Sequence, residues 1–340
     1  MQRLTLILSD LYLPEENQLI HESGGGFPQT HELPELSALL NIAREPEHIG
    51  DWRQWLLREL GARHDAVSLA GICARGSLDA GGLDGAWLAT PVALEARLDH
   101  VRMVDRGLLN LDVEERGACR AEFDRVFGPQ YTLHDGGARA FILAGLPGSA
   151  PIPDPARLLG DEIGPALRAA DAAELRRLWA EIEMWLHGSA FNDARERARR
   201  RRVSALWLWG RDGARAGALE IDARQVAMLG RDPLVGGLSR MKQSPWRDAP
   251  RSLSGLEGDP RHAIVEFAVL TGLEQESLAE LDTHWFAAAR HALASGQLSL
   301  LEVVANDRCF RVTPRARFRF WRGKHGWLEN LARPAGKPQA

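Results

Sequence analysis

The sequence predicts an α/β fold with a largely parallel central sheet and helices on both faces. Short apolar runs alternate with helical patterns along the 340 residues, and the run at 203–209 is apolar on both faces, as a central parallel strand is. Hydrophobic residues make up 45% and charged residues 26%, which is typical of a globular protein. We expect a single α/β domain over residues 1–335, with room for a small inserted or appended subdomain, and a disordered tail at 336–340.

The first third of the chain begins with a strand and returns to one after two helices. Leu4–Leu8 is an apolar run that ends at Ser9-Asp10, and a glycine-rich loop follows it. Apolar residues at helical spacing predict helices at 36–43 and 52–60. The apolar run at 67–74 then predicts another strand.

The rest of the chain carries the clearest helix signals. Asp112 and Glu115 form an N-terminal capping signature for a helix at 112–127, and a proline- and glycine-rich linker follows at 145–164. The helix at 171–187 has one apolar face. Towards the C-terminus we expect the following elements: strands at 263–270, 298–304 and 309–313, a helix at 274–294, and a half-buried edge strand at 317–321.

Composition excludes several functional classes. The net charge of −4 gives no general attraction to nucleic acid or anionic lipid. Cys73, Cys119 and Cys309 are far apart and form no CxxC pair, so we expect buried, reduced thiols rather than zinc or disulfides. The apolar run at the N-terminus is too short for a signal-peptide core or a membrane span, so we expect a cytoplasmic protein.

Asp10 is the first candidate for a functional residue. It follows the first predicted strand, and ligands of open α/β sheets bind outside the carboxyl ends of the strands. The sequence contains no HExxH metal motif, no GxSxG nucleophile motif and no phosphate-binding glycine motif. We therefore assign no catalytic residue, no metal and no cofactor, and treat Asp10 as a candidate ligand-binding residue.

A second candidate site lies between the helix at 171–187 and the strand at 203–209. We expect a polar turn there that brings His187, Asn192 and Arg195 together, and these side chains suit an anion. The same residue types also satisfy helix ends and loop amides, so a purely structural role is the alternative.

Residues 183–210 resemble a segment of the cofactor-independent phosphoglycerate mutases, most closely the archaeal type and proteobacterial relatives of the RpfE type. The resemblance implies an alkaline-phosphatase-like α/β fold, in which an aspartate at the position of Asp10 binds metal and is followed by glycine. Here Leu11 follows instead. The segment at 87–94 is also similar to the proteobacterial relatives, but Thr90 stands where they carry an acidic residue.

Two basic segments leave a nucleic-acid role open. Six arginines fall within 195–202, and arginines alternate with aromatic residues within 315–324. The first segment also contains Glu196 and no aromatic residue, which favours a solvated loop or a protein-contact surface. Nucleic-acid binding would need the two segments to form one basic face.

The residues and the resemblance together predict a degenerate, non-catalytic mutase-like protein that binds a small anion or an unidentified protein partner in a regulatory role. A metal-dependent phosphoryl-transfer enzyme that uses Asp10 in a rearranged site is the first alternative. Nucleic-acid binding through 195–202 is the second, and no membrane partner is expected.

Overall fold

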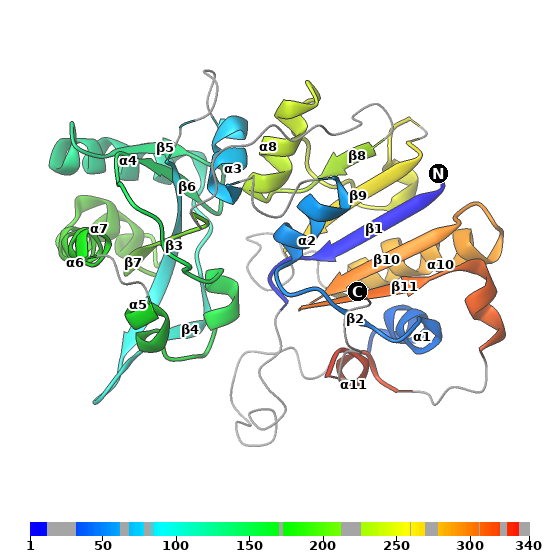
Figure 1. Ribbon diagram of the computed structural model, residues 1–340. Coiled ribbons are helices and arrows are strands. Elements are labelled where there is room, and N and C mark those ends of the chain that lie inside the picture. The colour runs from blue at the N-terminus through cyan, green and yellow to red at the C-terminus, as the bar shows by residue number, and fades with distance from the viewer. Residues whose placement is uncertain are drawn as a thin grey trace. The chain divides into compact units, whose positions relative to one another are not determined.

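The chain divides into two compact units. Unit 1 comprises Met1–Leu60, Ile221–Gly230 and Arg247–Ala340, and unit 2 comprises Gly61–Glu220 and Arg231–Trp246. The computed structural model describes residues 1–11, 32–61, 68–77, 83, 85–169, 173–211, 226–258, 260–268, 278–305, 307–319 and 325–332 (Figure 1). The glycine-rich loop after Asp10 and the tail at 336–340 lie outside these residues, and the single-domain expectation stays a prediction. No described helix has both the length and the apolar character needed to cross a membrane.

Unit 1 is built on a six-stranded mixed sheet in the order β2-β11-β10-β1-β9-β8. Four neighbouring strands run parallel: β8 (Val226–Leu229), β9 (His262–Phe267), β1 (Arg3–Leu8) and β10 (Leu300–Ala305). At one edge, β11 (Arg308–Val312) and β2 (Glu47–His48) are antiparallel. The predicted parallel arrangement therefore holds for these four strands, but the sheet as a whole is mixed.

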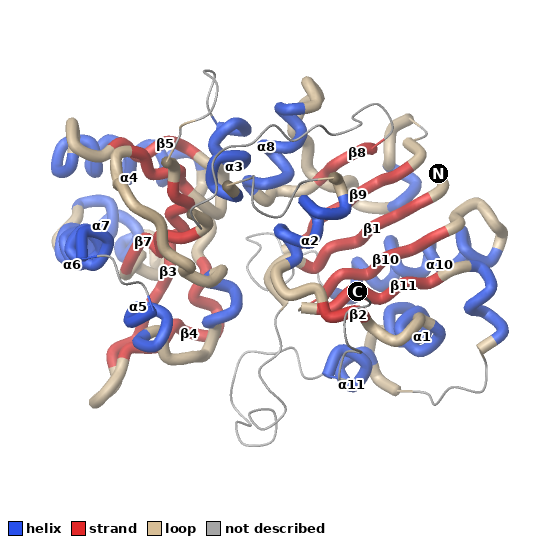
Figure 2. Tube along the Cα trace, in the orientation of Figure 1, coloured by secondary structure: helices blue, strands red, loops and turns tan. Residues whose placement is uncertain are grey.

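Helices pack on both faces of this sheet, as Figure 2 shows. One face carries the main core and is covered by α1 (Pro34–Ile42), α10 (Ala287–Ala294) and α11 (Trp327–Ala332). The other face is covered by α2 (Trp52–Glu59), whose Asp51 side chain accepts the first free amides of the helix. α9 (Leu278–Leu281) continues through a π-helical turn at Asp282–Phe286 into α10, so the predicted helix at 274–294 is confirmed over its described residues.

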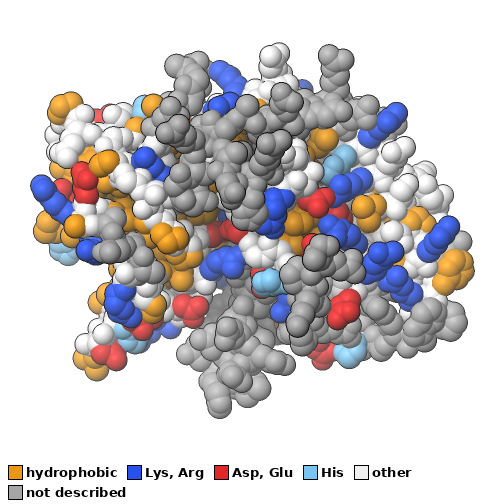
Figure 3. All heavy atoms as spheres, in the orientation of Figure 1, with side chains coloured by type: hydrophobic (Ala, Val, Ile, Leu, Met, Phe, Trp, Pro, Cys, Tyr) orange, Lys and Arg blue, Asp and Glu red, His pale blue; other side chains and the backbone are white. Residues whose placement is uncertain are grey.

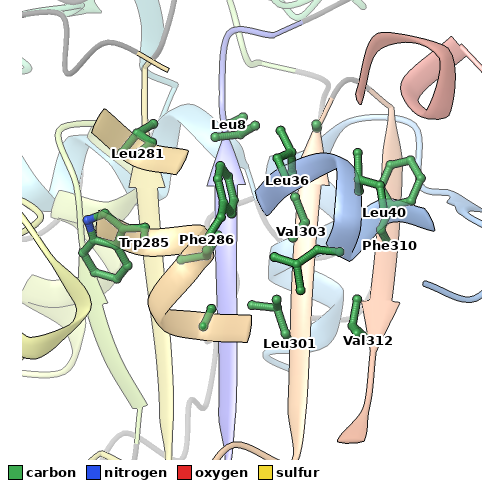
Figure 4. Close-up of a cluster of buried hydrophobic side chains, with 14 of the residues drawn as sticks. Leu8, Leu36, Leu40, Leu281, Trp285, Phe286, Leu301, Val303, Phe310 and Val312 are labelled. Carbon is green, nitrogen blue, oxygen red and sulfur yellow. The ribbon is translucent and has the colours of Figure 1, made fainter. Parts of the chain in front are cut away.

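Alternation along the strands explains why the two faces differ. In β1, Leu4, Leu6 and Leu8 belong to the main core, whereas Arg3 and Thr5 point to the opposite face. Figure 4 shows the core side chains of β1, β10 and β11 packed against those of α1 and the Asp282–Phe286 turn. The chain is thus apolar on one side of the sheet and carries charged residues on the other.

Unit 2 is built on a five-stranded antiparallel sheet. β3 (Trp87–Ala96) is its longest strand and pairs with β4 (Val101–Leu108), β6 (Phe141–Ala144) and β7 (Ala205–Trp209), while β5 (Thr132–Asp135) pairs with β6. The strand predicted at 203–209 therefore exists, but it is antiparallel to β3 rather than central and parallel. Its apolar character comes from burial of every residue.

The run predicted as a strand at 67–74 is a helix, α3 (Leu69–Ser77). The Ser68 hydroxyl accepts the amide of Gly71 at 3.2 Å and caps the first turn. α3 packs on α8 (Pro233–Met241) through glycines, since a β-carbon on Gly237 would lie 2.1 Å from the carbonyl oxygen of Ile72. A short apolar run is compatible with a strand and with a buried helix. Here the close packing against α8 stabilises the helix.

The other predicted helices of unit 2 are confirmed. α4 (Val113–Phe127) begins with the reciprocal capping contacts of Asp112 and Glu115, and α6 is Ala173–His187. The linker at 145–164 includes a 3₁₀ turn at Pro155–Leu158 and leads into α5 (Gly164–Ala169). At the C-terminus, 317–321 is not an edge strand: a 3₁₀ turn at Pro314–Phe318 occupies its described part, because Pro314 starts a tight turn.

Candidate functional site

The carboxyl edge of the parallel strands in unit 1 holds a group of buried polar residues. Ser9 follows β1, and its amide donates to the carbonyl of Phe267 at the end of β9, at 2.9 Å. The Ser9 hydroxyl donates to the carboxylate of Glu266, and the indole of Trp52 donates to the Ser9 carbonyl at 3.2 Å. Ser9, Asp10 and Glu266 are each at most 3% exposed.

A glycine allows the Glu266 carboxylate to lie where it does. Gly230 follows β8 with a φ of +141°, and a β-carbon there would lie 2.6 Å from Oε2 of Glu266. β8 and β9 are neighbours in the sheet, so Gly230 lies at the same edge. Any larger residue would displace the carboxylate.

Leu11 turns the chain inward immediately after Asp10. Its side chain is fully buried in the main core of unit 1, at the position where the family that the sequence resembles has glycine. Asp10 is therefore held between a buried serine and a core leucine. Two carboxylates, those of Asp10 and Glu266, therefore lie buried at the carboxyl edge of the parallel strands.

No metal-binding cluster accompanies these carboxylates in the part of the chain that the structure describes. There, no group of three or more His, Cys, Asp or Glu side chains is placed to hold a metal ion. The three cysteines are free and buried, as predicted, and burial raises the pKa of the Cys119 thiol to about 12.

The second candidate site is a corner of unit 2 between α6 and β7. The polar turn predicted there is mostly helical: α7 (Ala190–Arg197) fills it, with Ser189 as its N-cap, because Ser189 accepts the amide of Asn192 at 3.2 Å. The carboxylate of Glu122, on α4, accepts the amides of Ala190 and Phe191. The hydrogen bonds of Ser189 and Glu122 therefore hold the first turn of α7 in place between α6 and β7.

Asn192 uses its whole side-chain amide to close this corner. Its Nδ2 donates to the carbonyls of Leu186 at 2.7 Å and Val203 at 2.8 Å, and its Oδ1 accepts the amide of Val203 at 2.8 Å. The residue is 1% exposed. These contacts join the end of α6 to the chain that leads into β7, which favours the structural role of Asn192.

Arg195 and Arg200 join the same corner to the start of α4. Arg195 is buried, forms a salt bridge with Glu115, and donates through Nε to the carbonyl of Arg201 at 2.8 Å. Burial lowers the pKa of Arg195, although Glu115 opposes that shift. Arg200 binds Asp112 at 2.6 Å and Glu115 at 2.9 Å, and its hydrogen bond holds the pKa of Asp112 below the usual value.

His187 takes part in the corner only through its backbone. Its side chain is exposed, and its carbonyl accepts Nη2 of Arg202 at 2.7 Å. The structure thus brings Asn192 and Arg195 together with His187 nearby in the chain, whereas Asp10 belongs to unit 1. Thr90 stands where the proteobacterial relatives carry an acidic residue. It lies in β3, and its hydroxyl accepts the indole N–H of Trp209 at 2.9 Å.

Sequence reasoning missed Ser9, Glu266 and a second buried carboxylate, Glu302. Glu302 is completely buried on the sheet face opposite the main core, where Arg3, Thr5 and Arg311 donate to it. One signal was available: Glu266 and Glu302 are each the only acidic residue in an otherwise largely apolar strand. A charge in such a strand must be paired inside the protein.

Comparison with known proteins gives similarities of fold at low identity. No family model matches the sequence, and no curated protein matches it. The chain is similar to a cofactor-independent phosphoglycerate mutase from Thermoplasma acidophilum DSM 1728, with 15% identity, a TM-score of 0.41, and coverage of 92% of this chain and 90% of that chain. It is also similar to the PH0037 protein from Pyrococcus horikoshii, with 12% identity, a TM-score of 0.43, and coverage of 92% and 87%. The relation to RpfE-type proteins stays a prediction.

Proposed function

We propose that this protein is a non-catalytic, regulatory binding protein on a mutase-like fold, and that its ligand is a protein partner. The observation that carries the proposal is the corner at α7. Asn192 and Arg195, the side chains that could have bound a small anion, make contacts that build the corner instead. Other arginines of the same segment remain exposed on its surface. A fixed, charged surface of this kind suits recognition of another protein.

An activity assay tests the non-catalytic part of the proposal. The purified chain would be assayed for mutase and phosphatase turnover with Mg²⁺, Mn²⁺ and Zn²⁺, beside the variant Asp10→Ala. We expect both proteins to match the buffer background, because Leu11 and Ser9 hold Asp10 in a buried position. Metal-dependent turnover that disappears in Asp10→Ala would overturn the proposal.

The buried carboxylates of Asp10 and Glu266, at the carboxyl edge of the parallel strands, favour a second candidate, a metal-dependent phosphoryl-transfer enzyme. In that case Asp10 and Glu266 would hold a cation at the carboxyl edge of the sheet. The test is elemental analysis of the purified protein, followed by melting with and without each metal. Stoichiometric metal and a rise in melting temperature that Asp10→Ala abolishes would establish this candidate, because a ligand of the folded state stabilises it.

Nucleic-acid binding receives no specific support. The arginines at 195–202 belong to unit 2 and the segment at 315–324 belongs to unit 1, with 320–324 outside the described residues. Within the first segment, carboxylates pair with Arg195, Arg200 and Arg202. On the face that Figure 3 draws, Lys and Arg side chains are interspersed with Asp and Glu.

A further inference from the structure

The arginines around α7 fall into two sets. Carboxylates pair with Arg195, Arg200 and Arg202, which therefore stabilise the fold. Arg106, Arg197, Arg199 and Arg201 are exposed, and no carboxylate among the described residues pairs with them. Arg197 bonds within its own helix, because its Nε donates to the carbonyl of Asp193 at 3.2 Å. Nη1 of Arg201 donates to the carbonyl of Arg106 at 3.2 Å, which places the β4 arginine beside the loop after α7. We call Arg106, Arg199 and Arg201 the arginine triad.

Arg199 occupies a backbone position that favours glycine. Its φ is +55°, and it follows the C-cap of α7. Its amide donates to the carbonyl of Glu196 at 2.9 Å, and the amide of Arg200 donates to the carbonyl of Arg195 at 2.8 Å. These two bonds define a Schellman motif, whose left-handed residue is usually glycine. An arginine here is held at a cost in backbone strain.

The Schellman motif explains the backbone conformation of Arg199, but its side chain forms no hydrogen bond or ion pair with a described residue. The side chain of Arg199 is exposed to solvent, next in sequence to the paired Arg200. The position of Arg199 therefore points to a ligand outside this chain.

We propose that the arginine triad binds an acidic segment of a partner protein. This inference rests on the proposed binding function and names the chemistry of the partner. Guanidinium groups recognise carboxylates through paired hydrogen bonds, and arginine clusters are a recurrent means of binding acidic peptides. The triad spans only a few residues, has no aromatic residue within 195–202, and lies near Asp112, Asp193 and Glu196. A site of this size can contact only a few charges, whereas nucleic-acid binding draws its affinity from many phosphate contacts along the backbone.

A comparison of two glycine variants at matched positions tests the arginine triad. Gln243 is the other non-glycine residue with a φ of +55°, and it ends α8 with the same motif, since its amide donates to Arg240 at 2.9 Å and the amide of Ser244 donates to Ser239 at 2.9 Å. Arg199→Gly and Gln243→Gly therefore relieve the same strain, but only the first removes a triad guanidinium. Arg177→Gln, on the exposed face of α6, controls for the loss of one positive charge.

Binding would be measured on the full chain by fluorescence anisotropy at low salt, with a labelled peptide of ten glutamates and a labelled single-stranded oligonucleotide of ten nucleotides. We expect Arg199→Gly to raise the melting temperature but to weaken peptide binding about five-fold, the effect of one exposed ion pair. Gln243→Gly should raise the melting temperature and, like Arg177→Gln, leave peptide binding unchanged.

Four outcomes would overturn the inference: no binding of the peptide, peptide binding that Arg199→Gly leaves intact, an equal loss in Arg177→Gln, and tighter binding of the oligonucleotide than of the peptide. The turnover assay separates this result from the proposed function. If the peptide fails to bind and no turnover is found, only the triad assignment falls. If turnover is found, the proposed function falls whatever the peptide does.

Discussion

Glu302 and Arg3 form a two-bond salt bridge on the face of the unit 1 sheet opposite the main core. Nε of Arg3 lies 2.8 Å from Oε2 of Glu302, and Nη2 lies 2.9 Å from Oε1. Glu302 also accepts the hydroxyl of Thr5 at 2.7 Å and Nε of Arg311 at 3.0 Å. Its partners lie on the neighbouring strands β1 and β11, so this carboxylate joins three strands of the sheet.

Removal of Glu302 should destabilise the protein more than removal of Arg3. Glu302→Ala leaves two arginines and a threonine around an empty space, whereas Arg3→Ala leaves the carboxylate with Arg311 and Thr5. Loss of one partner of a buried ion pair costs about 3 to 5 kcal/mol of unfolding free energy. Because Arg3 is partly exposed, we expect Glu302→Ala to cost about 3 kcal/mol, the lower end of this range. Denaturant unfolding measures both values, and an equal or larger effect of Arg3→Ala would contradict the assignment.

Glu302 should make the free energy of unfolding depend on pH. Burial alone would raise its pKa, but the hydrogen bonds and charges of Arg3, Thr5 and Arg311 outweigh burial and hold the pKa below the ordinary value. A carboxyl with a lowered pKa stabilises the fold above the pKa of the unfolded chain, about 4.3, and loses that effect as the pH falls through the folded value.

Glu302→Gln tests this sign. The variant should be less stable than the wild type at pH 7, and the difference should shrink as the pH falls from about 4.3 through the lower pKa of the folded carboxyl, because the unfolded wild-type chain takes up a proton first. Unfolding free energies measured from pH 7 down to pH 3 check it. A difference that grows as the pH falls would show that the pKa is raised instead.

Asn192→Ala should cost about 2 to 4 kcal/mol of unfolding free energy. The substitution leaves two carbonyls and one amide, at Leu186 and Val203, buried without their partners. Asn192→Asp is the informative companion, because it keeps the acceptor for the Val203 amide but can no longer donate to the two carbonyls. We expect Asn192→Asp to be at least as unstable as Asn192→Ala in chemical denaturation. A small loss in both variants would mean that the corner does not depend on this amide.

Gly237→Ala should destabilise the contact between α3 and α8. The added methyl group would lie 2.1 Å from the carbonyl oxygen of Ile72, so the two helices must separate, at about 1 to 3 kcal/mol. Gly117→Ala in α4 is the matched control, since nothing lies within 4 Å of the new methyl group, and alanine favours a helix by about 1 kcal/mol over glycine. Melting temperatures should therefore move in opposite directions, and a shift of the same sign in both would exclude this packing.

Much of the fold could be predicted from local patterns. The apolar alternation of β1 and the capping signature at Asp112 and Glu115 each depend on residues close in sequence, and both are confirmed. The run at 67–74 was predicted wrongly because its character depends on glycines of α8, more than 150 residues later in the chain. Strand direction was equally inaccessible: the sequence of β7 shows that it is buried, and only its pairing with β3 shows that it is antiparallel.

The candidate sites show the same division. Asn192 and Arg195 were recognised as polar residues of one corner, but a sequence does not show whether such side chains face a ligand or the backbone. Here the two side chains donate to the carbonyls of Leu186, Val203 and Arg201, so they face the backbone. Ser9 has an ordinary environment along the chain, and the single acidic residue of β9, Glu266, does not show what its partner is. Only the parallel register of β1 and β9 brings the two side chains together.

The order of strands in unit 1 has a consequence for synthesis on the ribosome. β1 is made before the other described strands of its sheet, yet both of its neighbours come from the last third of the given sequence, and 257 positions separate Thr5 from His262. At about 5 to 20 residues per second, the first strand waits for tens of seconds with two unpaired edges. Most of unit 2 is a continuous stretch of chain that emerges meanwhile. We therefore expect β1 to stay unpaired during synthesis for longer than the described strands of unit 2.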